Sequence, residues 1–314
     1  MREFELILRI RERVASRDDV VLGIGDDAAL LLPAAGMQLV VAMDTLNEGV
    51  HFPAGTAPSA IGWKALAVNL SDLAAMGATP AWCALSLSLP EPDAGFIDGF
   101  LDGFLQLAQQ HDVALVGGDT TRGPLSVCVT VHGFVEPGQA LRRDGASVGD
   151  EVWVSGTLGD AAAALVQWRS GAAQTDAGLR ERLDRPTPRL ALGRALRAIA
   201  SACIDVSDGL LADLAHVCKA SGVGAEVDVA ALPASDALLA AFDRPQRRAV
   251  QTAGGDDYEL CFTAPPSCTA KLASLQAETR LTRIGRITAG QAVRARDAAD
   301  AGWQPAATGY QHFG

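Results

Sequence analysis

Acidic residues recur at the ends of apolar segments throughout this chain. They are Asp26, Asp27, Asp44, Asp119, Asp205, Asp208, Asp256 and Asp257. Aspartate favours turns, so turn chemistry alone can explain each of them singly. If strand ends bring several of these carboxylates together, they repel one another unless cations lie between them. Oxygen-only ligands suit magnesium or calcium and give no reason to expect zinc.

Asp72 is the acid that turn chemistry does not explain. It lies inside the helix expected over residues 59–76, on one face with Val68 and Asn69. A carboxylate on such an apolar face is unfavourable unless it is paired or binds a metal. Lys64 lies two helical turns earlier, about 12 Å along the axis, too far to pair with it directly. A structural ion pair with another partner remains the alternative to a metal.

Glycine pairs adjoin two of these acids, Gly117–Gly118 before Asp119 and Gly254–Gly255 before Asp256. Glycine lets the backbone approach a bulky anion such as a polyphosphate. Acids beside glycines therefore predict a site at which magnesium ions bridge aspartates to phosphates. The formal net charge of −11 disfavours nucleic acid and anionic membrane surfaces as partners. Cations are then the natural means of holding a nucleotide.

Composition is that of an ordinary globular protein. With 314 residues, 49% hydrophobic and 20% charged, the chain is long enough for roughly two domains. Its six cysteines form no C-x-x-C pair, which indicates thiols in a reducing compartment. The charged start MREFELILRIRERV is unlike a signal peptide, and no apolar run is long enough to span a membrane. We expect a cytoplasmic location.

Hydrophobic periodicity in the first half predicts a mixed sheet with helices. The expected helices are 3–15, 59–76 and 94–111, and the expected strands are 28–32, 38–43, 81–89, 113–116 and 125–135, with GGDTTRG as a turn. The order strand, helix, strand, strand is a split βαβ signature of an α+β sandwich.

A composition shift at PGQALRRDGASVGD predicts a domain boundary. We expect an N-terminal ATP- and magnesium-binding domain over 1–137, a linker over 138–150 and a C-terminal α/β domain over 151–314. The C-terminal expectations are strands 151–155, 203–206 and 225–230, helices 159–170, 187–200 and 208–220, and a polar surface loop over 170–184.

Several familiar catalytic signatures are absent. The segment Gly23–Ala28 fits the loose dinucleotide pattern G-x-G-x-x-[GA], but it opens a strand-like run where a helix is required. The sequence has no Walker motif, no protein-kinase H-R-D or D-F-G motif and no G-x-S-x-G elbow. The five histidines are scattered, although His51 follows DTLNEGV closely and so lies near Asp44.

Taken together, the motifs closely resemble the thiamine-monophosphate kinase family. They are GIGDDAAL, MDTLNEGVHF, KALAVNLSDLAAMGA, GGDTTRGPLSV, IDVSDGLLADLAH, GGDDYEL and GYQHF. This family belongs to the aminoimidazole ribonucleotide synthetase-like superfamily, with selenophosphate synthetase. The resemblance covers essentially the whole chain. It implies the superfamily's two-domain fold, a homodimer formed through the N-terminal domains, and ATP-dependent phosphorylation of thiamine monophosphate to thiamine diphosphate, the last step of that biosynthesis.

The resemblance also implies roles for matching residues. The magnesium ligands, which are also the predicted catalytic residues, are Asp27, Asp44, Asp72, Asp119, Asp205 and Asp208. Ala42 and Met43 stand where members often have hydroxyl residues, so only their backbone carbonyls could ligate metal. The implied ATP contacts are Gly118, Asp119, Arg143 and Ser207, and the implied substrate contacts are His51, Asp256 and Tyr310. Members often carry glutamate in place of Asp256.

The expected chemistry is direct in-line transfer between two phosphates. The acceptor phosphate, with a second pKa of about 6, is mostly dianionic at neutral pH, so no general base is needed. Arg143 is a candidate to stabilise charge on the transferred group, and the sequence leaves its neighbour Arg142 open. Tyr310 can offer an aromatic face to the cationic thiazolium ring. The number of magnesium ions and dependence on a monovalent cation stay open.

Two alternatives remain from the sequence. One is another ATP-using member of the superfamily, such as an aminoimidazole ribonucleotide or selenophosphate synthetase. The latter would be expected to carry a reactive cysteine or selenocysteine near its N-terminus, and here no cysteine precedes Cys83. The other is a non-catalytic protein that binds divalent cations through the same acidic loops.

Overall fold

The computed structural model forms two compact units, each described here by itself. It describes residues 3–171, 175–277, 279–297, 303–305, 307, 309 and 310. Unit 1 consists of Met1–Leu73 and Ala78–Gly138, and unit 2 of Ala74–Gly77 and Gln139–Gly314. None of the helices in the described ranges has the length and apolarity that a bilayer crossing requires.

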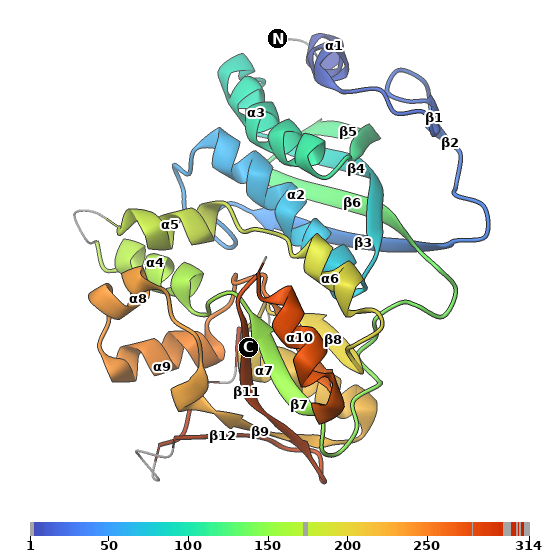
Figure 1. The fold of residues 1–314 in the computed structure, drawn as a ribbon. Helices are drawn as coiled ribbons and strands as arrows, with labels where there is room; N and C mark the ends of the chain where they lie inside the picture. Colours follow the sequence, from blue (N-terminus) through green and yellow to red (C-terminus); the bar gives the residue numbers. More distant parts are fainter. Residues whose placement is uncertain are drawn as a thin grey trace. The chain divides into compact units, whose positions relative to one another are not determined.

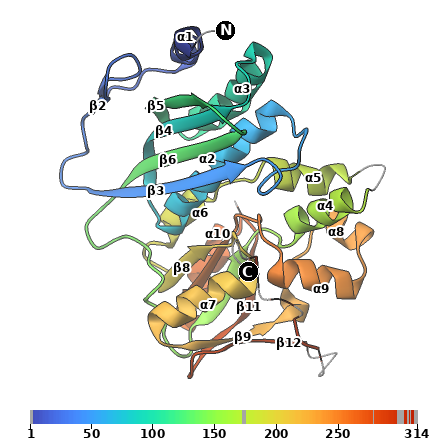
Figure 2. The ribbon, with the colours of Figure 1, turned by 180° about the vertical axis from the view of Figure 1, so that it is seen from behind.

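Unit 1 is built around a four-stranded mixed sheet. Across the sheet the strands are β3 (Gln38–Asn47), β6 (Ser126–Val135), β4 (Thr79–Leu89) and β5 (Ala114–Arg122). Strand β4 is parallel to β5 and antiparallel to β6, and β6 is antiparallel to β3. Helices α2 (Pro58–Ala75) and α3 (Ala94–Gln110) lie against one face of this sheet (Figures 1 and 2).

Small residues set how closely α2 and α3 pack. A Cβ added at Gly62 would lie 2.0 Å from the carbonyl oxygen of Phe100, and one at Gly103 would lie 1.8 Å from that of Ser59. Side chains at these two positions would push the helices apart. The close approach leaves Leu66 and Leu70 of α2 fully buried, so α2 is a rigid support for the sheet.

The N-terminal segment of unit 1 packs beside α3 and β5. Helix α1 (Glu3–Arg13) is joined to α3 by ion pairs of Arg9 with Asp98 and of Arg13 with Asp98 and Asp102. The short antiparallel strands β1 (Val20–Leu22) and β2 (Leu30–Leu31) follow. Val20 and Leu31 pack against the cluster that contains Trp82. This arrangement fixes the glycine-rich loop between β1 and β2 next to the sheet.

Two predictions for this unit are corrected by the strand pairing. GGDTTR is strand rather than turn, because β5 continues to Arg122 and residues 117–122 pair with β4. Strands β4 and β5 are therefore direct neighbours joined by α3. The split βαβ unit of the sheet is instead β3–α2–β4, since β6 lies between those two parallel strands.

Unit 2 contains a six-stranded sheet with helices around it. Across the sheet its strands are β12 (Val293–Arg296), β9 (Gly224–Asp228), β11 (Leu281–Thr288), β7 (Glu151–Ser155), β10 (Leu260–Ala264) and β8 (Ala202–Asp205). Its helices are α4 (Asp160–Arg169), α5 (Ala177–Asp184), α6 (Leu190–Leu196), α7 (Leu210–Ser221), α8 (Asp236–Ala241), α9 (Arg244–Ala253) and α10 (Thr269–Leu275), with 3-10 turns η1 (Val229–Ala231) and η2 (Pro266–Cys268). All strand pairs are antiparallel except β12 with β9.

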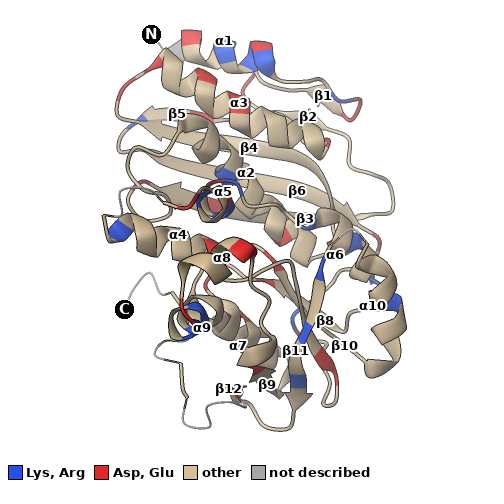
Figure 3. Ribbon diagram, turned by 60° about the vertical axis from the view of Figure 1, so that its left-hand side comes forward, with Lys and Arg blue, Asp and Glu red and all other residues tan. Residues whose placement is uncertain are grey.

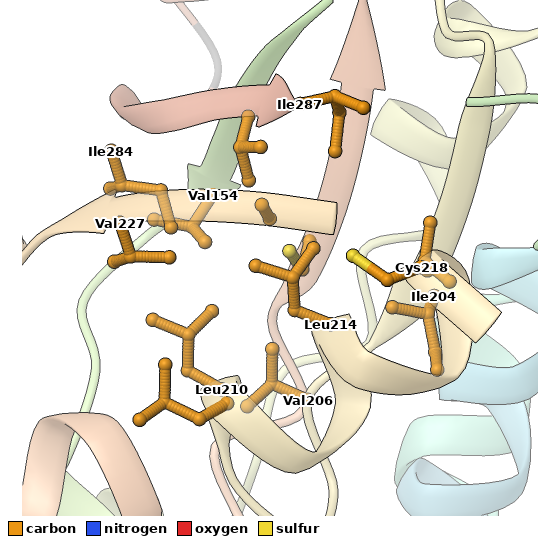
Figure 4. Close-up of a cluster of buried hydrophobic side chains, with 14 of the residues drawn as sticks. Val154, Ile204, Val206, Leu210, Leu214, Cys218, Val227, Ile284 and Ile287 are labelled. Atoms are coloured by element: carbon orange, nitrogen blue, oxygen red, sulfur yellow. The ribbon is translucent and has the colours of Figure 1, made fainter. Parts of the chain in front are cut away.

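Helix α7 supplies the centre of this unit's core. Leu210, Leu214 and Cys218 recur every four residues and so share one face of the helix. Figure 4 shows these side chains gathered with labelled residues of four strands or strand ends: Val154, Ile204, Val206, Val227, Ile284 and Ile287. This packing fixes the start of α7 relative to the end of β8. The predicted site acids Asp205 and Asp208 lie at the end of β8 and in the segment that follows it.

Two expectations for the second half differ from the structure, a helix that was missed and a helix that was predicted too long. Residues 177–184 form helix α5 rather than loop, because Asp176 caps the helix by accepting from the backbone N–H groups of Gly178 and Leu179, and Leu183 is buried. The helix expected over 187–200 is shortened to α6. The segment 139–150 packs into unit 2, where Leu141 is buried and the Cys203 N–H donates to the Arg142 carbonyl.

Candidate active site

A pocket of about 770 Å³ in unit 1 collects three of the predicted residues, Asp27, Gly118 and Asp119. Its walls are α1, the loop from Gly23 to Ala29, and parts of β4 and β5. The acids come from different segments, since Asp27 lies between β1 and β2 and Asp119 lies within β5. The pocket therefore joins two acidic motifs that are about ninety residues apart in the sequence.

Gly118 is a position in this pocket that only glycine fits. Its φ is +150°, and a Cβ there would lie 1.8 Å from the carbonyl oxygen of Leu85 in β4. Nothing lies within 4 Å of a Cβ built at the adjacent Gly117. The first glycine of the pair thus leaves open space at the pocket, and the second allows β5 to pass close to β4.

Asp44 lies on the edge strand β3, where a side chain from α2 holds it. The Asp44 N–H donates to Oδ1 of Asn69 at 2.9 Å, and Nδ2 of Asn69 donates to the Ala65 carbonyl at 2.9 Å. Asn69 is completely buried, so these contacts satisfy its amide. Ala42 and Met43 precede Asp44 on the same strand, and the Met43 side chain is 62% exposed.

Asp72 and His51 also lie in unit 1. Asp72 is half-buried on α2, one turn beyond Asn69, so its solvation is greater than the sequence pattern indicated. The Asn47 N–H donates to Nδ1 of His51 at 2.9 Å, which makes that nitrogen an acceptor and places the proton of a neutral imidazole on Nε2. Lys64 is buried and donates to the His51 carbonyl at 2.9 Å, so it anchors this loop.

In unit 2, Asp205 is the last residue of β8, and Ser207 and Asp208 lie in the short turn between β8 and α7. One oxygen of Asp213, Oδ2, accepts from the backbone N–H groups of Ser207, Asp208 and Gly209 at 3.0, 3.1 and 3.1 Å. Asp213 is 3% exposed, and burial followed by the charges of Asp205 and Asp208 raises its pKa to about 7. Its carboxyl group fixes the backbone of the turn that carries both predicted metal ligands.

The predicted substrate residues Asp256 and Tyr310 join this same turn. The Asp256 N–H donates to the Ser207 carbonyl and the Tyr310 N–H to the Asp208 carbonyl, both at 2.9 Å. Asp256 has a φ of +69°, a left-handed conformation that a non-glycine residue adopts at some cost. The hydroxyl of Tyr258 donates to Oδ1 of Asp256 at 3.2 Å. Unit 2 thus gathers Asp205, Ser207, Asp208, Asp256 and Tyr310.

Two fully buried acids support the strained Asp256 segment. Both oxygens of Asp257 accept from the Gly159 N–H, at 3.0 and 2.8 Å, and burial raises the pKa of this carboxyl group well above its usual value. Glu259 forms ion pairs with Arg182 and Arg189 and accepts from the Ser155 hydroxyl. A buried carboxylate with this many donors is satisfied, so the segment is held on both sides of Tyr258.

The structure distinguishes the two neighbouring arginines that the sequence left open. Arg142 is engaged in a two-point contact with Asp144, and the pairing raises its pKa. Arg143 is exposed, its backbone carbonyl accepts from the Ser221 hydroxyl, and among the described residues its guanidinium forms no ion pair. Of the two guanidinium groups, that of Arg143 is therefore the better candidate to meet a phosphate.

The acids fit magnesium that is shared with a substrate better than magnesium held by protein alone. Among the described residues, no group of three or more His, Cys, Asp or Glu side chains is placed to hold a metal ion. Magnesium is usually bound by one or two carboxylates together with substrate phosphates and water. The pairs Asp27 with Asp119 and Asp205 with Asp208 match that pattern, and all their donors are oxygens.

Known proteins match almost the entire chain. AIR synthase related protein, N-terminal domain, matches residues 25–135, and AIR synthase related protein, C-terminal domain, matches residues 147–298. The thiamine-monophosphate kinase of Salmonella typhimurium is 51% identical over 268 residues, which cover 84% of this chain and 82% of that protein. The chain belongs to the thiamine-monophosphate kinase family.

Solved structures of the thiamine-monophosphate kinase family share the fold. The enzyme from Stenotrophomonas maltophilia K279a has a TM-score of 0.89 and 58% identity, covering 96% of this chain and 98% of that chain. AaThiL complexed with AMPPCP and TMP has a TM-score of 0.80 and 33% identity, covering 100% of this chain and 99% of that chain. The expected two-domain fold and the family resemblance are confirmed.

Sequence reasoning missed the residues that support the site. Asn69, Asp213, Asp257 and Glu259 all lie inside the quoted motifs, but their carboxyl or amide groups bind backbone and arginine groups. A usable signal existed for Asp213, which stands four residues after Gly209 in the first turn of a helix, where an acid can accept from free backbone N–H groups. For Asp257, next to Asp256, the sequence offers no such signal.

Proposed function

We propose that this enzyme transfers the γ-phosphoryl group of ATP to thiamine monophosphate, producing thiamine diphosphate and ADP. The observation that carries the proposal is the likeness to AaThiL, which was solved with AMPPCP, an ATP analogue, and TMP, and which aligns with the whole of this chain. The placement of the predicted residues supports it, since unit 1 gathers acids and glycines at one pocket and unit 2 gathers acids at one turn.

Binding and orientation are the main tasks of the side chains in this reaction. The open space at Gly117 and the close strand approach at Gly118 suit a polyphosphate lying against the backbone of β5. The Ser207 hydroxyl and the Arg143 guanidinium are the proposed further ATP contacts. The acceptor phosphate is already ionised, so in-line attack needs no side-chain base and no phosphoenzyme.

Magnesium ions are proposed to bind at the acidic cluster of each unit. The residues that would hold it are Asp27, Asp44, Asp72, Asp119, Asp205 and Asp208, with backbone carbonyl oxygens of Ala42 and Met43. When bound, the ions neutralise the charge of the two phosphate-bearing reactants and so let them approach.

His51, Asp256 and Tyr310 are the proposed substrate contacts. The cationic thiazolium ring is attracted by a carboxylate and by an aromatic ring. Tyr310 is 47% exposed, so its ring is accessible, and the Asp208 carbonyl accepts from its backbone N–H. The left-handed backbone at Asp256 sets the direction of a side chain that is one methylene shorter than the glutamate common in the family.

A homodimer formed through unit 1 is proposed on the apolar surface of β3. Leu39, Val41 and Met43 alternate along this edge strand and are 49%, 55% and 62% exposed. Apolar side chains that alternate on one face of a strand normally cover another surface. We further propose that the enzyme works in the cytoplasm, which suits its use of ATP and its six free cysteines.

The test is a product assay with purified protein, ATP and magnesium chloride. Thiamine monophosphate is expected to yield thiamine diphosphate and ADP in equal amounts, and free thiamine is expected to be a poor acceptor because it lacks the anionic nucleophile. Faster turnover of free thiamine than of its monophosphate would overturn the proposal. Repeating the assay with potassium or sodium chloride tests the monovalent-cation dependence that the sequence leaves open.

A further inference from the structure

Helix α1 carries arginines that serve two different surfaces (basic residues blue in Figure 3). Arg9 and Arg13 turn toward α3, where they form ion pairs with Asp98 and Asp102. Arg11 instead lines the 770 Å³ pocket that contains Asp27, Gly118 and Asp119. Arg9 and Arg13 therefore attach the helix, and Arg11 has no part in that attachment.

The Arg11 guanidinium lies directly over the backbone of Gly25. A Cβ added at Gly25 would be 2.6 Å from Nη1 and 3.0 Å from Cζ of Arg11. Gly25 has a φ of +126°, so its place in the acidic loop needs glycine for the backbone as well as for this contact. The loop that carries Asp27 is thereby shaped around the arginine.

Within the described part of the chain this guanidinium forms no ion pair, although Asp26, Asp27 and Asp119 line the same pocket. Arg9, Arg13 and Arg17 each have an acidic partner. A guanidinium is a planar, permanently charged donor that matches the oxygens of a phosphate. The cation in this pocket is thus available to an anionic ligand.

We propose that Arg11 binds the polyphosphate of the nucleotide, a contact that rests on the proposed function. The phosphate acceptor is a second possible source of such an anion, but the pocket favours the nucleotide because it also holds Gly118 and Asp119, the predicted ATP contacts of unit 1. Arg11 adds a fixed positive charge to a chain with net charge −11 and three lysines.

The experiment measures binding of AMPPCP with magnesium by isothermal titration calorimetry, which needs no turnover. R11A is expected to weaken AMPPCP binding roughly tenfold or more, with partial recovery in R11K, which keeps the charge and loses the planar fork. R13A is the matched control on the same helix and should bind AMPPCP as the unmodified protein does. Adenosine and thiamine monophosphate are titrated in parallel, and neither should respond to R11A.

Each of the following results would overturn the proposed contact between Arg11 and the nucleotide polyphosphate. Unchanged AMPPCP binding in R11A removes the contact, and an equal loss in R13A means that helix attachment is responsible. An equal loss for adenosine places the contact away from the phosphates, and a loss confined to thiamine monophosphate assigns the arginine to the acceptor. Failure of the unmodified protein to make thiamine diphosphate would sink the proposed function separately, because these binding measurements do not depend on it.

Discussion

Two site acids of unit 1 and two of unit 2 are held by different means. In unit 1, Asp44 and Asp119 lie within strands, so the hydrogen-bonding ladder of the sheet fixes their backbone. In unit 2, Asp208 and Asp256 lie in connecting segments. The Asp213 carboxyl group accepts from the Asp208 N–H, and the Asp257 carboxyl group, next to Asp256, accepts from the Gly159 N–H. Acids in regular structure need little local support, whereas acids in turns depend on additional buried acids.

Removing the Asp213 side chain should cause the largest loss of activity among the variants that test this difference. D213A leaves three backbone N–H groups without their acceptor, and each unsatisfied buried group costs about 1–3 kcal/mol. We expect kcat/KM for thiamine monophosphate to fall about a hundredfold. D236A is the control, since Asp236 is an exposed acid in the first turn of α8. Full activity in D213A would show that the turn does not need this support.

Substituting Gly118 tests whether strand geometry fixes the acids of unit 1. In G118A the new methyl group would meet the Leu85 carbonyl, so β5 must move away from β4. We expect the free energy of unfolding to fall by about 2–4 kcal/mol, measured by urea denaturation. G117A is the matched control, because its methyl group enters open space, and it should change stability by less than about 1 kcal/mol. Equal effects would refute the assigned packing.

Weakening the support of Asp256 should have a more specific effect. D257N keeps one oxygen acceptor for the Gly159 N–H, but it replaces the second acceptor oxygen with an amide NH2 group. We expect the KM for thiamine monophosphate to rise roughly fivefold with kcat and the KM for ATP nearly unchanged, a loss of about 1 kcal/mol. A fall in kcat with an unchanged KM would contradict the role given to this segment.

Removing the side chain that supports Asp44 should have the smallest effect. N69A takes away the acceptor of the Asp44 N–H, yet β3 remains paired with β6 along its whole length. We expect turnover to fall by less than about fivefold, which corresponds to roughly 1 kcal/mol. The steady-state rate at saturating substrates checks this. A loss as large as that of D213A would erase the contrast between the two units.

Much of the fold follows from sequence because its elements are long and periodic. The helix predicted over 59–76 and the strand predicted over 81–89 agree with α2 and β4 to within two residues. The error at GGDTTRG arose because paired glycines usually mark turns, whereas here Gly118 permits close pairing of two strands. The helix α5 was missed because its short apolar pattern is set by contacts with α4.

The acids proposed to bind metal could be picked out from the sequence. The residues that hold those acids in place could not. Asp27 and Asp119 were grouped because both stand at the ends of apolar segments and match motifs of the family, and one pocket holds both. Nothing in a linear pattern shows that the Asp213 carboxyl group faces back along the chain to three N–H groups, since that depends on how β8 meets α7. Arg11 was likewise hidden among the arginines of one helix.

The decisive measurement asks whether aspartates of each unit bind the magnesium ions that the reaction uses. It compares the magnesium requirement of two variants, each lacking one acid of one unit. Formation of thiamine diphosphate from ATP and thiamine monophosphate is measured against magnesium concentration for the unmodified protein, D27N and D208N. We predict that EDTA abolishes turnover, that magnesium restores it, and that each variant needs at least about tenfold more magnesium. Undiminished turnover in EDTA, or a magnesium response in both variants equal to that of the unmodified protein, would contradict it.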